Sequence, residues 1–174
     1  MQQTATLLLM YAVLPLLILA GFADWVCHRA TEIESTSGLR ENALHWLMFG
    51  QMGAAIAVVV LFQINLTVLA LVGLVFLAHE LTVWMELRYT VARREVRPIE
   101  QVVHSFLELL PLVALALLVV VASPDWGLRL RRAPWSVGYA ATMAAGVLLF
   151  NVLPLAEESW RCLRFRTRRS PGPR

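Results

Sequence analysis

The sequence predicts an all-α transmembrane helical bundle of about five spans, and three observations support this fold class. Of the 174 residues, 59% are hydrophobic and 16% are charged, whereas a soluble domain is nearer half apolar and carries more charge. The mean hydropathy is +0.66. Five apolar runs each reach the roughly 20 residues that a helix needs to cross a bilayer. We expect one transmembrane domain, residues 1–160, followed by an Arg-rich tail, residues 161–174.

The expected spans follow the apolar runs in chain order. The opening run MQQTATLLLMYAVLPLLILAG has no basic residue before its apolar core and no clear cleavage motif before Asp24, so we interpret it as a span and not as a signal peptide. Only Phe62 to Thr67 separates the second run from the third, which predicts a tight hairpin. The expected spans cover residues 5–29, 43–63, 66–91, 99–122 and 136–160.

The distribution of arginine predicts the orientation of the chain. All 15 basic residues are Arg; twelve fall on the side where the first span ends, and three fall on the other side, within residues 129–132. Because cytoplasmic loops carry an excess of positive charge, we expect a bacterial inner-membrane protein with the N-terminus outside and the C-terminus in the cytoplasm. The Arg-rich tail is expected to rest on anionic membrane lipids rather than to bind nucleic acid.

Ionisable side chains concentrate on the same side as the arginines. Eleven of the twelve acidic residues and all four histidines fall there, and Asp125 alone falls on the other side. Asp24 and His28 lie four residues apart in the first span, and Glu41 and His45 repeat this spacing at the start of the second. Residues four apart share one face of a helix, so each pair is expected to point in one direction.

The third and fourth spans carry ionisable residues to a greater depth. His79 and Glu86 share a helix face, and Glu100, His104 and Glu108 form one stripe. At 1.5 Å per residue, His79 and Glu108 both lie about 16 Å below the membrane surface, close enough in depth to meet, and the other residues allow a second, shallower layer of ligands. Burying an ionisable group in hydrocarbon costs at least about 2.5 to 3.5 kcal/mol, which favours a shared functional interior.

Several of these residues also have a purely structural interpretation. Glu41 fits the third position of a helix start. His28 and His45 fit interfacial residues whose polar ring atoms reach the membrane surface. The adjacent Glu157 and Glu158 are expected to neutralise the charge of nearby arginines.

Carboxylate and imidazole ligands from four antiparallel helices resemble carboxylate-bridged di-iron or di-manganese bundles in ligand chemistry. This resemblance implies two divalent metal ions, with iron favoured over manganese or zinc, and four spans around a polar site. The Glu-x-x-His pairs of those bundles are absent. Glu100 or Glu80 is expected to act as a catalytic base. The expected metal ligands are Asp24, His28, Glu41, His45, His79, Glu86, His104 and Glu108.

The runs ADWVCHRATEIESTSG and RREVRPIEQVVHSFLELLP resemble short uncharacterised bacterial integral membrane proteins, which implies a family but no activity. The metal hypothesis leads to an oxidoreductase that acts on a hydrophobic substrate from the cytoplasmic side. It requires an electron donor, because the chain has no nucleotide or flavin motif. Two alternatives stay open. One is a haem-binding bundle; the other is a non-enzymatic transporter or accessory subunit, which needs a homo-oligomer to form a sizeable pathway.

Overall fold

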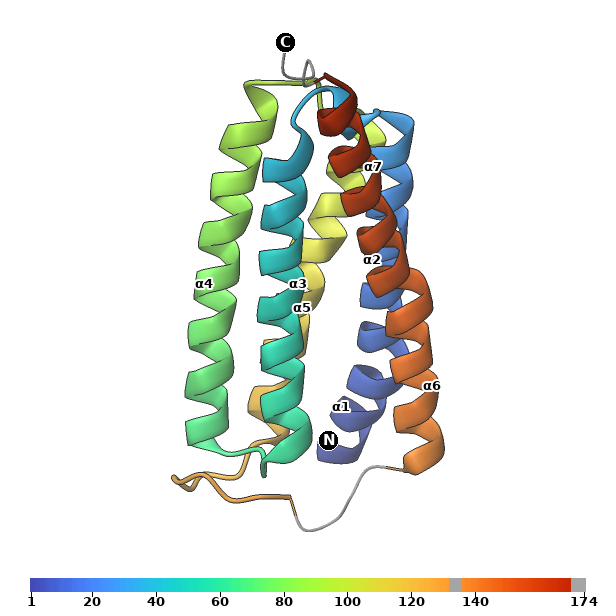
Figure 1. Ribbon diagram of the computed structural model, residues 1–174. Helices are drawn as coiled ribbons and strands as arrows, with labels where there is room; N and C mark the ends of the chain where they lie inside the picture. Colours follow the sequence, from blue (N-terminus) through green and yellow to red (C-terminus); the bar gives the residue numbers. More distant parts are fainter. Residues whose placement is uncertain (132–135, 170–174) are drawn as a thin grey trace.

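The protein is an all-α bundle whose long helices follow the predicted spans (Figure 1). The computed structural model describes residues 1–131 and 136–169; residues 132–135 of the fourth connection and 170–174 of the predicted tail lie outside this part. Within the described residues, five helices are long and apolar enough to cross a membrane, as expected of an integral membrane protein. They span Gln2–Ala30, Gly38–Leu61, Leu66–Val91, Pro98–Val121 and Val137–Arg168.

The first and last long helices each contain a π-helical turn. Leu14 donates its N–H to the carbonyl of Leu9, five residues earlier, and Leu153 makes the same bond to Leu148. Both turns end in the sequence Val-Leu-Pro-Leu. Proline has no N–H and its ring crowds the carbonyl four residues earlier, so the helix widens just before it. The elements are α1 (Gln2–Leu8), η1 (Leu9–Val13) and α2 (Leu14–Ala30), then α6 (Val137–Val147), η3 (Leu148–Val152) and α7 (Leu153–Arg169).

The three remaining long helices form the middle of the bundle. α3 (Gly38–Leu61) and α4 (Leu66–Val91) form the predicted hairpin and pack along each other. Asn65 caps α4 by accepting the N–H of Val68 at 3.1 Å, which satisfies one of the free donors at a helix start. α5 (Pro98–Val121) begins with proline, whose missing N–H costs nothing at the first helical position.

Two predicted boundaries differ from the observed ones. α3 begins five residues before the predicted start at residue 43, and its early polar residues Glu41 and Asn42 are buried inside the bundle, which hydropathy does not detect. A 3₁₀ turn, η2 (Ile33–Ser35), precedes it, and Gly38 starts the helix with φ +62°, a conformation that glycine adopts without strain. The predicted tail is helical through Arg169, because α7 continues beyond the span.

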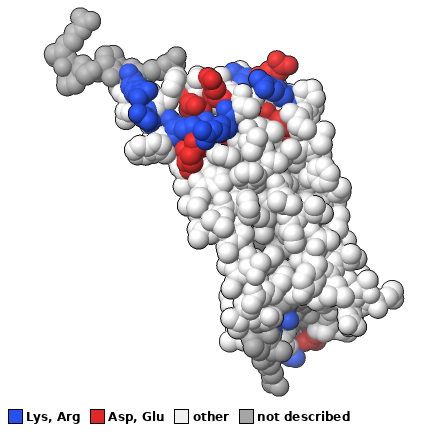
Figure 2. All heavy atoms as spheres, turned by 90° about the vertical axis from the view of Figure 1, so that its right-hand side faces the viewer, with Lys and Arg blue, Asp and Glu red and all other residues white. Residues whose placement is uncertain are grey.

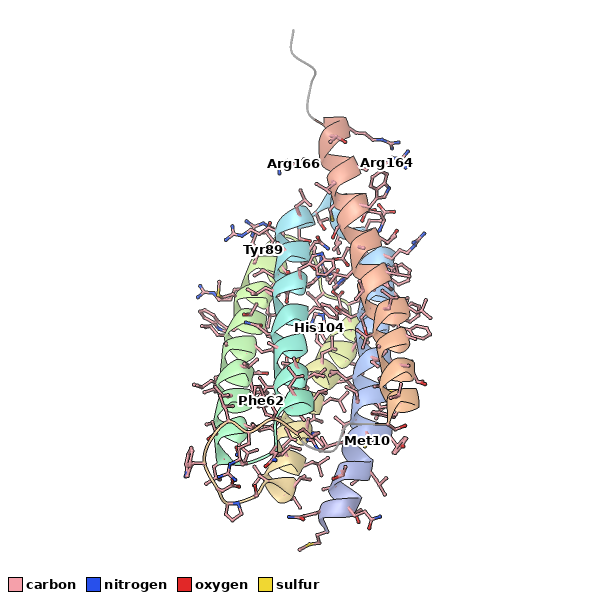
Figure 3. The ribbon with its side chains drawn as sticks, turned by 60° about the horizontal axis from the view of Figure 1, so that its bottom comes forward. Met10, Phe62, Tyr89, His104, Arg164 and Arg166 are labelled. Carbon is pink, nitrogen blue, oxygen red and sulfur yellow. The ribbon has the colours of Figure 1, made fainter. Side chains whose placement is uncertain are left out.

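Charged side chains gather at one end of the bundle, which we call the Arg-rich end. Figure 2 shows arginine and acidic side chains there and a broad uncharged band along the visible side. α2, α4 and α7 end at this end, and α3 and α5 begin there. Figure 3 shows His104 between the helices and Arg164 and Arg166 on the last turns of α7. The opposite half contains an apolar core cluster of Val68, Val72 and Leu118.

Candidate metal centre

A cavity of about 310 Å³ lies inside the bundle and is lined by residues from all five long helices. Its polar part lies toward the Arg-rich end. The fifth long helix was expected to lie beside the site. Its part α7 instead contributes Glu158, a potential metal ligand, to the cavity wall. The ionisable residues in the polar part are Asp24, His28, His45, Glu86, His104 and Glu158.

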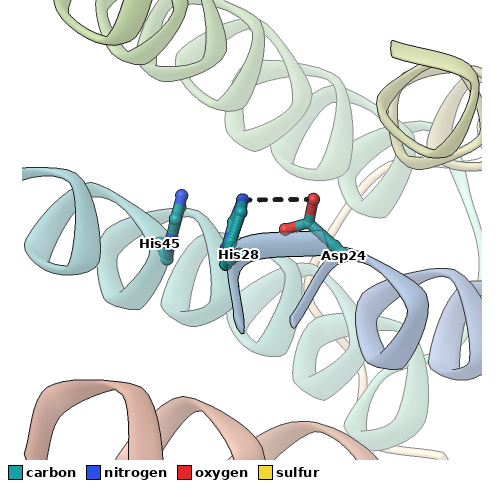
Figure 4. Close-up of side chains that lie close together, drawn as sticks. All are labelled: Asp24, His28 and His45. Atoms are coloured by element: carbon teal, nitrogen blue, oxygen red, sulfur yellow. Dashed lines mark ion pairs between the residues drawn. The ribbon is translucent and has the colours of Figure 1, made fainter. Parts of the chain in front are cut away.

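Two histidines from different helices stack at the centre of this polar part. The rings of His28 on α2 and His45 on α3 are parallel to within 8°, with centroids 4.4 Å apart. Their Nδ1 atoms lie 3.1 and 2.9 Å from the two carboxylate oxygens of Glu158. An ionised carboxylate only accepts hydrogen bonds, so both Nδ1 atoms donate. Figure 4 shows the two rings side by side, with His28 paired to Asp24.

Glu158 was not predicted as a site residue. It is 1% exposed, and its Oε1 also accepts a hydrogen bond from Asn42 Nδ2 at 2.9 Å. Glu157 does pair with Arg161, as expected, at 3.0 Å, whereas Glu158 points into the bundle. The difference is one of helical phase, because adjacent residues point about 100° apart.

A sequence signal for Glu158 exists on its own helix face. It lies three residues after Leu155, which lines the cavity, and four before Cys162, which is buried. Such i, i+3, i+7 spacing marks the face of a helix that points inward. The acidic doublet beside several arginines obscured this signal.

Three carboxylates surround the second nitrogen of His28. Its Nε2 lies 3.4 Å from Asp24 Oδ1, 3.5 Å from Glu100 Oε1 and 3.9 Å from Glu41 Oε1. This nitrogen is buried and makes no hydrogen bond in the described part of the chain. Ligand atoms about 2.1 Å from a shared ion lie about 3 to 3.5 Å from one another. The distances to Asp24 and Glu100 fall in this range, whereas the distance to Glu41 exceeds it.

Three groups of described residues bring potential ligand atoms within 4.8 Å of one another. Together they include six of the eight predicted metal ligands, and they add Glu100, which was predicted as a base. The groups are Asp24 with His28 and His45, His28 with Glu100 and His104, and Glu41 with His45 and Glu86.

His79 and Glu108 line the same cavity but belong to none of these groups. The rise per residue predicted a similar depth for both, and both contact the cavity, but neither brings a ligand atom within reach of a group. His79 is 6% exposed, and its Nδ1 has no hydrogen-bond partner among the described residues. Glu80, the other predicted base, is not among the described residues that line the cavity.

Arg94, in the connection between α4 and α5, was not predicted as a site residue. Its Nη2 lies 2.6 Å from Glu41 Oε1 and 2.5 Å from Glu100 Oε1, and its side chain is 4% exposed. Burial alone would lower the pKa of Arg94, but the hydrogen bonds to Glu100 and Glu41 outweigh burial and raise that pKa above its ordinary value. The guanidinium is a permanent cation beside the proposed ligands.

His104 completes the wall of the site on α5. Its Nε2 lies 2.9 Å from Asp24 Oδ1, and its ring lies edge-on to that of His28, with centroids 6.3 Å apart. Asp24 Oδ1 thus lies between two histidines, hydrogen-bonded to His104 and 3.4 Å from His28 Nε2.

No family model matches this chain, and the comparisons with curated proteins and with solved structures found no match. The resemblance to short bacterial membrane proteins therefore stays a prediction. The fold that it implied, a bundle of apolar helices, is present.

Proposed function

We propose that this protein is a membrane-embedded metal-binding protein with a site for two divalent ions, and that it is an oxidoreductase acting on a hydrophobic substrate. The observation that carries the proposal is the pair of stacked histidines held by one carboxylate. Metal-binding histidines typically donate their second ring N–H to a carboxylate or carbonyl, which fixes the tautomer and leaves the other nitrogen as a ligand. Glu158 provides this contact to both His28 and His45.

The distance between the two rings supports two ions rather than one. Two-metal sites hold their ions about 3.5 to 4 Å apart, close to the 4.4 Å between the ring centroids of His28 and His45. Each ring then serves one ion. We assign Asp24, Glu100 and His104 to the ion of His28, and Glu41 and Glu86 to the ion of His45.

The charge of the cluster also supports two divalent cations. With neutral histidines, the carboxylates and the single guanidinium leave an excess of four negative charges, which two divalent ions neutralise. A cation makes the burial of such carboxylates in a membrane protein tolerable, and it keeps the imidazoles unprotonated. The carboxylates are Asp24, Glu41, Glu86, Glu100 and Glu158, and the guanidinium is that of Arg94.

The donor set favours iron or manganese. Carboxylate oxygens outnumber imidazole nitrogens, and such mixed oxygen and nitrogen sites suit these ions, although zinc accepts the same donors. When bound, two redox-active ions would supply electrons for reactions with dioxygen. The chain supplies the apolar cavity that excludes water, the tautomers set by Glu158 and the fixed charge of Arg94. An electron donor is required as a partner, because the sequence carries no nucleotide or flavin motif.

The stacked arrangement does not favour the haem alternative. Two axial imidazoles must approach a haem iron from opposite faces, whereas His28 and His45 stack on each other with nothing between their rings. We further propose, from the excess of arginine on this side of the predicted topology, that the Arg-rich end faces the cytoplasm of a bacterial inner membrane.

Metal analysis of the protein, purified with its affinity tag removed, tests the proposed function. We expect about two equivalents of iron or manganese per chain, and no Soret band. His28→Ala and His45→Ala should each lower the metal content to one equivalent or less. His79→Ala is the matched control, because it removes a cavity-lining histidine outside the three ligand groups.

The proposal is overturned if the unmodified protein binds no metal after reconstitution with ferrous, manganous or zinc salts. It is also overturned if both His28→Ala and His45→Ala retain the full metal content. A Soret band with a haem stoichiometry of one or two would replace it with the haem alternative.

A further inference from the structure

The cavity continues beyond its polar part as an apolar arm that runs away from the Arg-rich end. From Asp24 to Leu14 the wall on α2 descends ten residues, which is about 15 Å at 1.5 Å per residue. α3 and α6 complete the arm. Its apolar lining includes Leu14, Leu17, Met52, Gly53, Ile56 and Val147.

The helices around this arm leave a route to the bilayer on one side. α3 packs against α7 near the Arg-rich end, but among the described residues it does not pack extensively against α6. Figure 1 shows α7 leaning toward α3, whereas α6 diverges from it. Gly53 lies on this part of α3, and a Cβ added there would meet nothing within 4 Å. The arm therefore has open space beside Gly53, at the level of the hydrocarbon.

An unpaired polar atom lies in the wall of the cavity outside its polar part. His79 lines the cavity and is 6% exposed, and its Nδ1 has no hydrogen-bond partner in the described part of the chain. Buried polar atoms of native proteins are nearly always paired, with protein, water or a ligand. A bound molecule that carries one hydrogen-bonding group would satisfy this nitrogen.

We infer that the arm binds one long-chain lipid with a hydroxyl or carbonyl group, which enters sideways between α3 and α6 and hydrogen-bonds to His79. This inference rests on the proposed function, because it names the class of substrate for the same site. The medium around the arm is hydrocarbon, so lipid chains are the most concentrated molecules at its opening. Pockets that bind ligands are mostly apolar with a few polar groups that fix orientation.

His79 also determines which part of the bound lipid lies nearest to the metal ligands. It precedes Glu86 by seven residues on α4, which is about 10 Å along the helix. A lipid with its polar group at His79 and its chain in the arm therefore presents the polar end, and not the methyl end, to the metal ligands. His79 is thus a specificity-determining residue rather than a ligand.

Photolabelling tests this inference on the purified full-length protein in detergent. The probe is a long-chain fatty alcohol with a diazirine near its methyl end, and labelled residues are mapped by peptide mass spectrometry. We expect labelling of residues in the arm, such as Met52 or Ile56, that excess unlabelled fatty alcohol suppresses. Gly53→Leu should reduce this labelling at least about fivefold, since the leucine side chain would occupy the space that the lipid needs.

The matched control is Gly50→Leu, because Gly50 lies on the same helix with no atom within 4 Å of an added Cβ, and it does not line the cavity. This variant should label like the unmodified protein. His79→Leu should weaken competition by the fatty alcohol about fivefold while keeping the competition by the corresponding alkane unchanged.

Metal content measured on the same samples separates the two proposals. Full metal content with arm labelling that Gly53→Leu blocks supports both. Full metal content with labelling that Gly53→Leu leaves unchanged, or with labelling only on outward-facing residues, overturns the lipid inference alone. Absence of metal from the unmodified protein overturns the proposed function and, with it, the assignment of the lipid as substrate.

Discussion

His28 on the first long helix and Glu158 on the last are 130 positions apart and are joined by a buried hydrogen bond of 3.1 Å between Nδ1 and Oε2. The same carboxylate binds His45 through its other oxygen at 2.9 Å. One side chain of α7 thus fixes the orientation of two imidazoles from α2 and α3. Without α7, the first four long helices would carry the ligands but not the group that orients them.

Glu158→Gln should weaken metal binding about 10- to 100-fold, the usual effect of removing a carboxylate that orients metal-binding histidines. The amide has one oxygen in place of two, so His28 and His45 can no longer both donate to it. Affinity is measured by competition with a chelator of known strength. Glu157→Gln is the matched control, because Glu157 pairs with Arg29 and Arg161 instead. Equal weakening in both variants would contradict the role assigned to Glu158.

Arg94→Gln should destabilise the metal-free protein by roughly 3–5 kcal/mol, because it leaves the buried Glu41 and Glu100 without a positive partner. Bound divalent metal should reduce this loss, since the ion supplies the missing charge. The measurement is thermal unfolding in detergent, with EDTA and with added metal.

Arg93→Gln is the control for this experiment. Arg93 is exposed and its guanidinium lies 3.7 Å from the ring centroid of Tyr89, so its loss should have little effect. A destabilisation of Arg94→Gln that is the same with EDTA and with metal would show that the guanidinium and the ion do not share a function.

Gly21→Val should destabilise the contact between the first and last long helices. A Cβ at Gly21 would lie 2.4 Å from Asn151 Nδ2, which donates to the carbonyl of Ile18 at 3.1 Å. The amide must move and lose this bond, at a cost of about 1–3 kcal/mol. Thermal unfolding followed by tryptophan fluorescence measures the change. Gly50→Val is the control, because it introduces the same side chain into open space. A similar loss of stability in this variant would show that the valine side chain itself, and not the contact with Asn151, causes the effect.

The fold was predictable because membrane spans depend on length and hydropathy, and both are local properties of the sequence. The pairs Asp24 with His28 and Glu41 with His45 were predictable for a similar reason, since residues four apart share a helix face in any α-helix. Both pairs belong to the ligand groups that the structure brings together.

Arg94, Glu158 and the position of His79 depend on contacts between helices, which a single sequence does not specify. Arg94 is one of three arginines between α4 and α5, and nothing local distinguishes it from Arg93. His79 lines the same cavity as Glu86, but the seven residues between them on α4, about 10 Å along the helix, leave it outside the ligand groups.

The two π-helical turns control the angular phase of the residues that follow them. Each turn contains one residue more than a regular α-helix would need, and one residue corresponds to a rotation of about 100°. If either turn became regular α-helix with all its residues kept, one half of that helix would rotate against the other by this angle and turn either His28 or Glu158 away from the site. The alignment of these two side chains is therefore determined in part by residue counts in the apolar middle of the membrane, several turns away from any ionisable group.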